Sequence, residues 1–143
     1  MKNKYIILGG LSIILALALF CFLNKIHFDK DYYERISGIK FPDKYKIIET
    51  RDNGEFVTIV SMHVAAADLQ MMIKNNKFDT LKPQQPIHFF GLGLLKKIKP
   101  DLEPLANKFV FQKKNGKNDC TYLIDLNKNI LWAEISYPDW GGN

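Results

Sequence analysis

The stretch from Tyr5 to Leu23 restricts the possible folds of this chain more than any other. Its nineteen residues, YIILGGLSIILALALFCFL, carry no charge, and only the tail MKNK precedes it. An α-helix rises about 1.5 Å per residue, so the stretch spans roughly 28 Å, close to the roughly 30 Å apolar core of a bilayer. The sequence therefore predicts a single transmembrane helix, with the lipid bilayer as the first partner of the chain.

Three fates of this stretch stay open. A cleaved secretory signal has an apolar core of about 7 to 15 residues before a small-x-small site. Residues 5–23 exceed that length, so we expect an uncleaved signal anchor. The first alternative is cleavage after Ala18, at the sequence ALA. The second is lipidation of Cys21, because the stretch loosely resembles a bacterial lipoprotein signal, although the bulky Phe20 departs from that pattern.

The charges around the anchor do not fix its orientation, because lysine and arginine occur on both sides of it. The basic-then-apolar start resembles signal anchors, which implies a cytoplasmic N-terminus and an exported C-terminal domain. The abundance of Lys, Asn and Ile is typical of AT-rich bacterial genomes. We therefore expect a single-pass protein of the inner (cytoplasmic) membrane of a bacterium, with a periplasmic domain.

The residues after the anchor are enough for one domain. Subtracting 23 residues from 143 leaves 120, which is the size of a single folded unit. We expect a tail and signal anchor over residues 1–23, a juxtamembrane helix and linker over 24–44, and a globular domain over 45–143. In the linker, Tyr33 and Ile36 share a helical spacing and Gly38 suits a helix end. Whether this helix meets the headgroups or packs on the domain stays open.

Turn signals and alternating apolar residues predict an α+β domain. Residues 45–50 and 55–64 form a predicted hairpin around Asn53-Gly54, since both turn residues accept positive φ. Strong helix formers over residues 65–76 predict a helix. A meander of three strands follows, at residues 108–114, 119–125 and 130–137. The order is ββαβββ, in which one helix covers a mainly antiparallel sheet of half-buried strands.

The connection over residues 77–104 is long and rich in proline. It contains an apolar patch over residues 87–95, followed by Lys96, Lys97 and Lys99. Long loops in compact domains are often functional, and an apolar patch beside lysines suits an anionic membrane surface. We nevertheless expect these residues to fill the core or cover a sheet edge, and contact with a membrane or partner is the alternative.

The domain shows no sequence signature of catalysis, metal or cofactor binding. The histidines, His27, His63 and His88, lie in separate elements without metal-ligand spacing. Cys120 is expected to be a free, buried thiol. The net charge of +5 comes mainly from lysine, with only two arginines, and no clustered arginine or aromatic platform indicates nucleic-acid binding.

Four aromatic residues are the candidates for binding a partner. Tyr137 and Trp140 lie in the C-terminal sequence YPDWGGN, and Phe89 and Phe90 lie in the apolar patch of the long connection. Trp and Tyr dominate the energetics of protein interfaces. Trp140 has the alternative role of covering the end of the sheet.

We therefore expect a membrane-anchored, non-catalytic, extracytoplasmic domain that binds a protein or envelope component. One alternative is an immunity-type protein that neutralises a periplasmic toxin. Another is a small hydrolase whose site, with His63, is assembled only by the fold.

Overall fold

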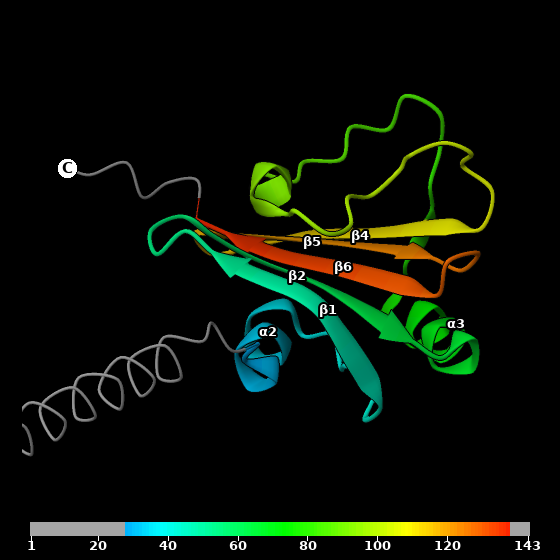
Figure 1. Ribbon diagram of the computed structural model, residues 1–143, viewed down its shortest axis with the longest axis horizontal. Helices are drawn as coiled ribbons and strands as arrows, with labels where there is room; N and C mark the ends of the chain where they lie inside the picture. Colours follow the sequence, from blue (N-terminus) through cyan, green and yellow to red (C-terminus); the bar gives the residue numbers. More distant parts are fainter. Residues whose placement is uncertain (1–27, 138–143) are drawn as a thin grey trace, which may run out of the picture.

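Six strands form one antiparallel sheet in this computed structural model, which describes residues 28–137 (Figure 1). The predicted anchor at residues 5–23 and the candidate Trp140 lie outside the described residues. The sheet order is β1-β2-β6-β5-β4-β3. The strands are β1 (Tyr45–Asp52), β2 (Val57–Val64), β3 (Asp79–Thr80), β4 (Lys108–Asn115), β5 (Asn118–Asp125) and β6 (Ile130–Ser136).

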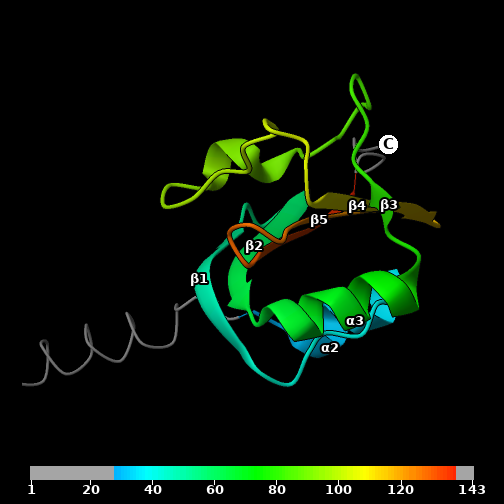
Figure 2. The same cartoon turned by 90° about the vertical axis from the view of Figure 1, so that its right-hand side faces the viewer.

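The two faces of the sheet are covered in different ways (Figure 2). Helices α2 (Lys30–Ser37) and α3 (Ala66–Asn76) lie on one face, which we call the helix face. The connection over residues 81–107, here called the strap, lies on the other and contains the short 3-10 helix η1 (Gly91–Leu94). One apolar cluster lies between the helices and the sheet, and a second lies between the strap and the sheet. The sheet is therefore the middle layer of three.

The α+β class and the antiparallel sheet are confirmed, and three details of the prediction are wrong. Two helices cover the helix face, not one, because Tyr33 of α2 is 2% exposed within the same apolar cluster as Leu69 of α3. The short strand β3 adds a member to the predicted ββαβββ order by pairing with β4. Strand β6 is buried on both faces, since the strap covers the side that was expected to be exposed.

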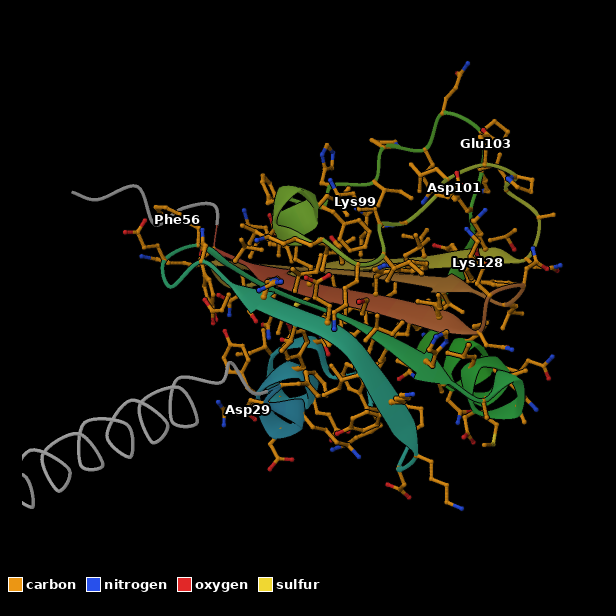
Figure 3. All side chains as sticks on the ribbon, viewed as in Figure 1. Asp29, Phe56, Lys99, Asp101, Glu103 and Lys128 are labelled. Carbon is orange, nitrogen blue, oxygen red and sulfur yellow. The ribbon has the colours of Figure 1, made fainter. Side chains whose placement is uncertain are left out.

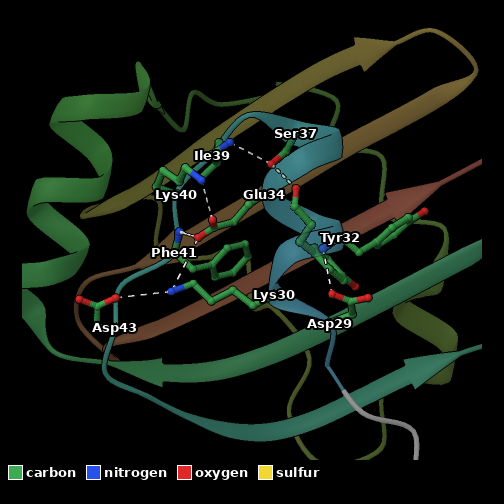
Figure 4. Close-up of polar contacts among 10 residues, drawn as sticks. Asp29, Lys30, Tyr32, Glu34, Ser37, Ile39, Lys40, Phe41 and Asp43 are labelled. Carbon is green, nitrogen blue, oxygen red and sulfur yellow. Dashed lines mark hydrogen bonds and ion pairs between the residues drawn. The ribbon is translucent and has the colours of Figure 1, made fainter.

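Helix α2 begins and ends at defined caps. The Tyr32 amide donates to Asp29 Oδ1 at 2.9 Å, and Gly38 ends the helix at φ 79°. Glu34 then fixes the chain that follows, because its carboxylate accepts hydrogen bonds from the Phe41 amide and from Lys40 Nζ, each at 2.8 Å (Figure 4). These contacts hold the chain after α2 against the helix, whereas the Tyr33 hydroxyl, 3.1 Å from Thr58 Oγ1, joins α2 to the sheet.

The predicted turn at Asn53-Gly54 is confirmed. Asn53 Oδ1 accepts the amides of Glu55, Phe56 and Val57 at 3.0, 2.8 and 2.9 Å, and Gly54 has a φ of 77°. Positive φ favours glycine because it has no Cβ. The turn projects from the same end of the domain as the start of α2.

The connection between β3 and β4 proves to be part of the core. Leu81 and Leu95 are buried against the sheet, in one cluster with Trp132. This confirms the expectation that apolar residues of the long connection fill the core. Among residues 28–137, no helix is both long enough and apolar enough to cross a membrane.

Candidate functional site

A cleft of about 360 Å³ opens at the end of the domain where the described chain begins and ends. Figure 3 shows Asp29 and Phe56 at this end, while Asp101, Glu103 and Lys128 lie at the opposite end. Several lining residues come from segments that are distant in sequence. Those that carry its chemistry are three acidic residues and three tyrosines, namely Asp29, Asp52, Glu55, Tyr32, Tyr33 and Tyr137.

Local structure places the three carboxylates around the cleft. Asp29 is the N-cap of α2. Asp52 ends β1 and accepts the Gly54 amide through Oδ1 at 2.6 Å. Glu55 lies in the Asn53-Gly54 turn and is exposed. Asp29 and Asp52 each engage one carboxylate oxygen in a backbone cap, which orients the group and leaves a second oxygen for a ligand.

The tyrosines provide neutral aromatic walls. Burial raises the pKa of Tyr33 well above its ordinary value, and its hydroxyl lies 3.1 Å from Thr58 Oγ1. Burial also raises the pKa of Tyr137, whose amide donates to the Phe56 carbonyl at 2.7 Å. Both phenols therefore stay uncharged at neutral pH, and the charge of the cleft comes from its carboxylates.

This arrangement can bind a cation. The described lining residues include no Lys, Arg or His, so nothing in that set neutralises the carboxylates. Carboxylates form charge-assisted hydrogen bonds with ammonium and guanidinium groups, and aromatic rings attract cations through their faces. One cation–π contact of this kind is present within the domain. The Arg35 guanidinium lies 5.8 Å from the centre of the ring of Tyr32, which lines the cleft.

The structure separates the aromatic residues that the sequence singled out. Tyr137 lines the cleft and packs against the helix-face cluster. Phe89 packs into the cluster beneath the strap, on the opposite face of the sheet. Phe90 is 60% exposed and lines a separate groove of about 480 Å³ with His88. The predicted candidates therefore do not form one site.

Two buried glutamates that the sequence did not single out hold the strap. Glu134 on β6 is 1% exposed and accepts the Phe90 and Gly91 amides, each at 2.8 Å. Glu49 on β1 is 5% exposed and accepts the Lys96 and Lys97 amides at 2.9 and 2.8 Å. Each glutamate fixes one end of the segment that contains η1.

The two glutamates differ in their electrostatic surroundings. Arg51 Nε and Nη2 each lie 2.7 Å from Glu49 Oε1. Burial raises the pKa of Glu49, but its hydrogen bonds from the Lys97 amide, Arg51 and the Lys96 amide outweigh burial and lower it overall. For Glu134, burial dominates over the two amide hydrogen bonds and raises the pKa from 4.5 to about 7. Glu49 is thus ionised at neutral pH, whereas Glu134 titrates there.

A sequence signal for Glu134 was present. It lies on the same side of β6 as Trp132, and a large apolar side chain on a supposedly exposed face indicates a cover. The Trp132 Nε1 group donates to the Ile98 carbonyl of the strap at 3.3 Å. The contact between Glu134 and the strap was missed because Phe90 and Gly91 lie more than forty residues away from Glu134 in the sequence.

The nucleophile and metal-ligand candidates are dispersed. His63 is exposed on β2 and pairs across strands with Lys46 and Ile130. Cys120 is a free, buried thiol, as expected, and burial raises its pKa to about 11. Within residues 28–137, no group of three or more His, Cys, Asp or Glu side chains is placed to hold a metal ion.

Comparison of the chain with protein-family models, with curated proteins and with solved structures gave no match.

Proposed function

We infer that this chain is a membrane-tethered, non-catalytic binding domain whose cleft receives a positively charged group of a protein partner. Residues 5–23 anchor it in the inner membrane, and the domain works on the periplasmic side. The observation that carries this proposal is the convergence of three carboxylates and three tyrosines in one cleft. The tethering rests on the uncharged run of nineteen residues.

The cleft is acidic, although the chain as a whole is basic. The protein has a formal net charge of +5, yet Asp29, Asp52 and Glu55 line this cleft together. Local acidic character within a basic protein favours a cationic ligand, because complementary charge steers association and selects the partner. Since the positive end of the α2 dipole offsets Asp29, Asp52 and Glu55 contribute most to this attraction.

The cleft lies close to the predicted anchor along the chain. Five residues, 24–28, separate Leu23 from Asp29. Even a fully extended chain spans at most about 3.5 Å per residue, so the cleft lies within roughly 21 Å of the end of the apolar run. A partner bound there is held beside the membrane surface.

Binding of a cationic peptide tests the cleft directly. The full-length protein in detergent micelles is titrated against fluorescein-labelled hexalysine at low ionic strength, and hexaglutamate serves as the negative peptide. The combined variant Asp52→Asn, Glu55→Gln keeps an acceptor for the Gly54 amide but removes two charges. We expect it to weaken hexalysine binding about tenfold, as the loss of two modest charge contacts implies.

A matched control removes the same number of charges elsewhere. Asp101 and Glu103 lie at the opposite end of the domain (Figure 3), so Asp101→Asn, Glu103→Gln is expected to leave the affinity within about twofold, since the Coulomb interaction with a peptide in the cleft falls off with distance through water. Equal losses in both variants, or no binding by the native protein, would contradict a cation site in the cleft.

The tethering is tested separately. Intact-mass measurement of the membrane-extracted protein distinguishes an uncleaved anchor from cleavage after Ala18 and from lipidation of Cys21. A topology reporter fused after Asn143 is expected to be active only outside the cytoplasm. Activity of a cytoplasm-restricted reporter instead would reverse the proposed orientation without affecting the cleft.

A further inference from the structure

The β4–β5 hairpin carries a concentration of positive charge. Residues 112–118, QKKNGKN, include the three lysines Lys113, Lys114 and Lys117 and no acidic residue. All three lysines are exposed. The first acidic residue that follows is Asp119, which faces Lys114 across the two strands. Even with Asp119 included, the hairpin has an excess of positive charge.

This hairpin lies at the end of the domain that the predicted anchor joins. Ser136 of β6 pairs with Val57 of β2 on one side and with Asp119 of β5 on the other. The β1–β2 turn and the β4–β5 turn therefore project from the same end of the sheet, where the described chain begins (Figure 1). The chain between Leu23 and Asp29 spans at most about 21 Å when fully extended, so the hairpin is held near any bilayer that contains the anchor.

Contacts with the C-terminal end of α2 fix the hairpin in place. Asn115 Nδ2 donates to the Ile36 carbonyl at 2.7 Å, and Lys113 Nζ donates to the Ser37 carbonyl at 3.2 Å. Because α2 is the first element after the predicted anchor, these hydrogen bonds set the position of the hairpin relative to the start of the domain. The charged hairpin is therefore presented from a defined surface.

Phe90 adds an exposed aromatic ring beside this hairpin. It is 60% exposed and lines a groove together with Lys114 and Asp119. Its amide donates to the buried Glu134 at 2.8 Å, which fixes the backbone that carries the ring. An exposed aromatic ring next to lysines suits the interface of an anionic bilayer, where the ring enters the headgroup region and the ammonium groups meet phosphates.

We propose that the β4–β5 hairpin and Phe90 dock the domain on the anionic phospholipids of the membrane that holds it. This inference rests on the tethering proposed above, and it does not depend on ligand binding in the cleft. A tether makes the contact intramolecular and raises its effective concentration. A few charge contacts and one aromatic ring are then enough, although they would bind a bilayer only weakly from solution.

Docking through this surface also orients the cleft. The cleft lies on the helix face, where the Tyr33 hydroxyl lies 3.1 Å from Thr58 Oγ1, whereas Phe90 lies in the strap on the opposite face. Lipid phosphates repel the carboxylates of Asp52 and Glu55 and attract the lysines of the hairpin. An anionic bilayer therefore turns the acidic cleft away from itself and leaves it open to a partner.

Paramagnetic lipids measure the docking. The full-length protein is reconstituted into nanodiscs of phosphatidylcholine alone or with one third phosphatidylglycerol, each containing a lipid with a gadolinium-chelating headgroup. Relaxation enhancement at the amides of Phe90 and Lys117 is expected to be about threefold larger in the phosphatidylglycerol discs, because the anionic headgroups hold the hairpin at the surface. The amide of Met71 on α3, at the opposite end of the domain (Figure 1), is expected to show no such increase.

Two pairs of substitutions separate the hairpin from charge in general. Lys114→Gln, Lys117→Gln is expected to reduce the enhancement in phosphatidylglycerol discs to its value in phosphatidylcholine. Lys74→Gln, Lys128→Gln removes the same charge at the opposite end of the domain (Figures 1 and 3). This control is expected to keep the enhancement within about 1.5-fold of the native value, since charges beyond a Debye length from the surface are screened.

The docking and the tethering fail in different ways. Co-elution with phosphatidylcholine discs reports the anchor alone, so co-elution without a lipid-dependent enhancement at the hairpin would overturn the docking and leave the tethering intact. Enhancement at the hairpin by added phosphatidylglycerol discs, without co-elution with phosphatidylcholine discs, would support the docking and contradict the tethering. Enhancement centred on Asp52 and Glu55, or unchanged in Lys114→Gln, Lys117→Gln, would also overturn the docking.

Discussion

The carboxylates in the cleft and those beneath the strap are the same chemical group in two settings. Glu49 and Glu134 are 5% and 1% exposed, and both oxygens of each accept hydrogen bonds from the protein. Asp52 and Glu55 are exposed, and of the two only Asp52 is fixed by a backbone amide. Burial makes the first pair part of the fold, whereas exposure beside aromatic walls leaves the second pair available to a ligand.

Glu49→Ala is the largest expected disturbance of stability. The substitution leaves the Lys96 and Lys97 amides without their acceptor and removes the ion pair with Arg51. Breaking a buried charged contact of this kind costs about 3 kcal/mol of unfolding free energy. Chemical denaturation of the full-length protein measures the loss. Glu55→Ala, the exposed counterpart, is expected to change the free energy of unfolding by less than about 0.5 kcal/mol. Similar losses in both variants would contradict the claim that the buried carboxylate stabilises the fold and the exposed one does not.

The pH dependence of stability separates Glu134 from Glu49. The folded-state pKa of Glu134 is raised to about 7, so its contribution is fully present below the unfolded value of 4.5 and is lost as pH rises through 7. The lowered pKa of Glu49 has the opposite effect, and its contribution is lost only below pH 4.5. We therefore expect the free energy of unfolding to rise by about 2 kcal/mol when the pH is lowered from 8 to 5.5.

Denaturation of Glu134→Gln over the same pH range supplies the control. Glutamine has nearly the same shape and keeps a carbonyl acceptor for one of the two strap amides, but it does not titrate. Its stability is expected to be flat between pH 8 and pH 5.5. A slope equal to that of the native protein would assign the effect to another group.

Gly91→Ala tests how closely the strap approaches the sheet. An added Cβ would meet Ile59 at 3.0 Å and Val57 at 3.2 Å, so the backbone must shift away from Glu134. We expect a loss of about 1 to 2 kcal/mol, as for other overpacked sites. Gly93 has no atom within 4 Å of an added Cβ, and Gly93→Ala is expected to be nearly neutral. Thermal unfolding distinguishes the two, and an equally neutral Gly91→Ala would show that the strap is loose there.

The strands could be predicted because their signals are local. The signals for β4, for β5 and for the turn at Asn53-Gly54 depend on neighbouring residues, and both strands and the turn appear in the structure, although β5 is buried on both faces and does not alternate. The burial of Glu134 could not be predicted in the same way. Its partners, Phe90 and Gly91, are more than forty residues away, so alternation alone made β6 look half exposed.

The cleft was beyond sequence reasoning for a similar reason. Tyr137 was identified as an aromatic candidate, but no motif in the sequence singles out Asp29, Asp52 or Glu55. Only the packing of α2 beside the β1–β2 turn brings them to one cleft. Single charges in a sequence carry no information about which of them meet in the fold.

Mapping the hexalysine contact by NMR tests the central claim most directly. Backbone amide shifts of the full-length protein in micelles are recorded during titration with the peptide. Shift changes are expected to concentrate at Asp29, at residues 52–58 and at Tyr137, and to be absent at Phe90 and Gly91. Changes centred on the strap, or spread evenly over the surface lysines and carboxylates, would contradict the assignment of the cleft as the binding site.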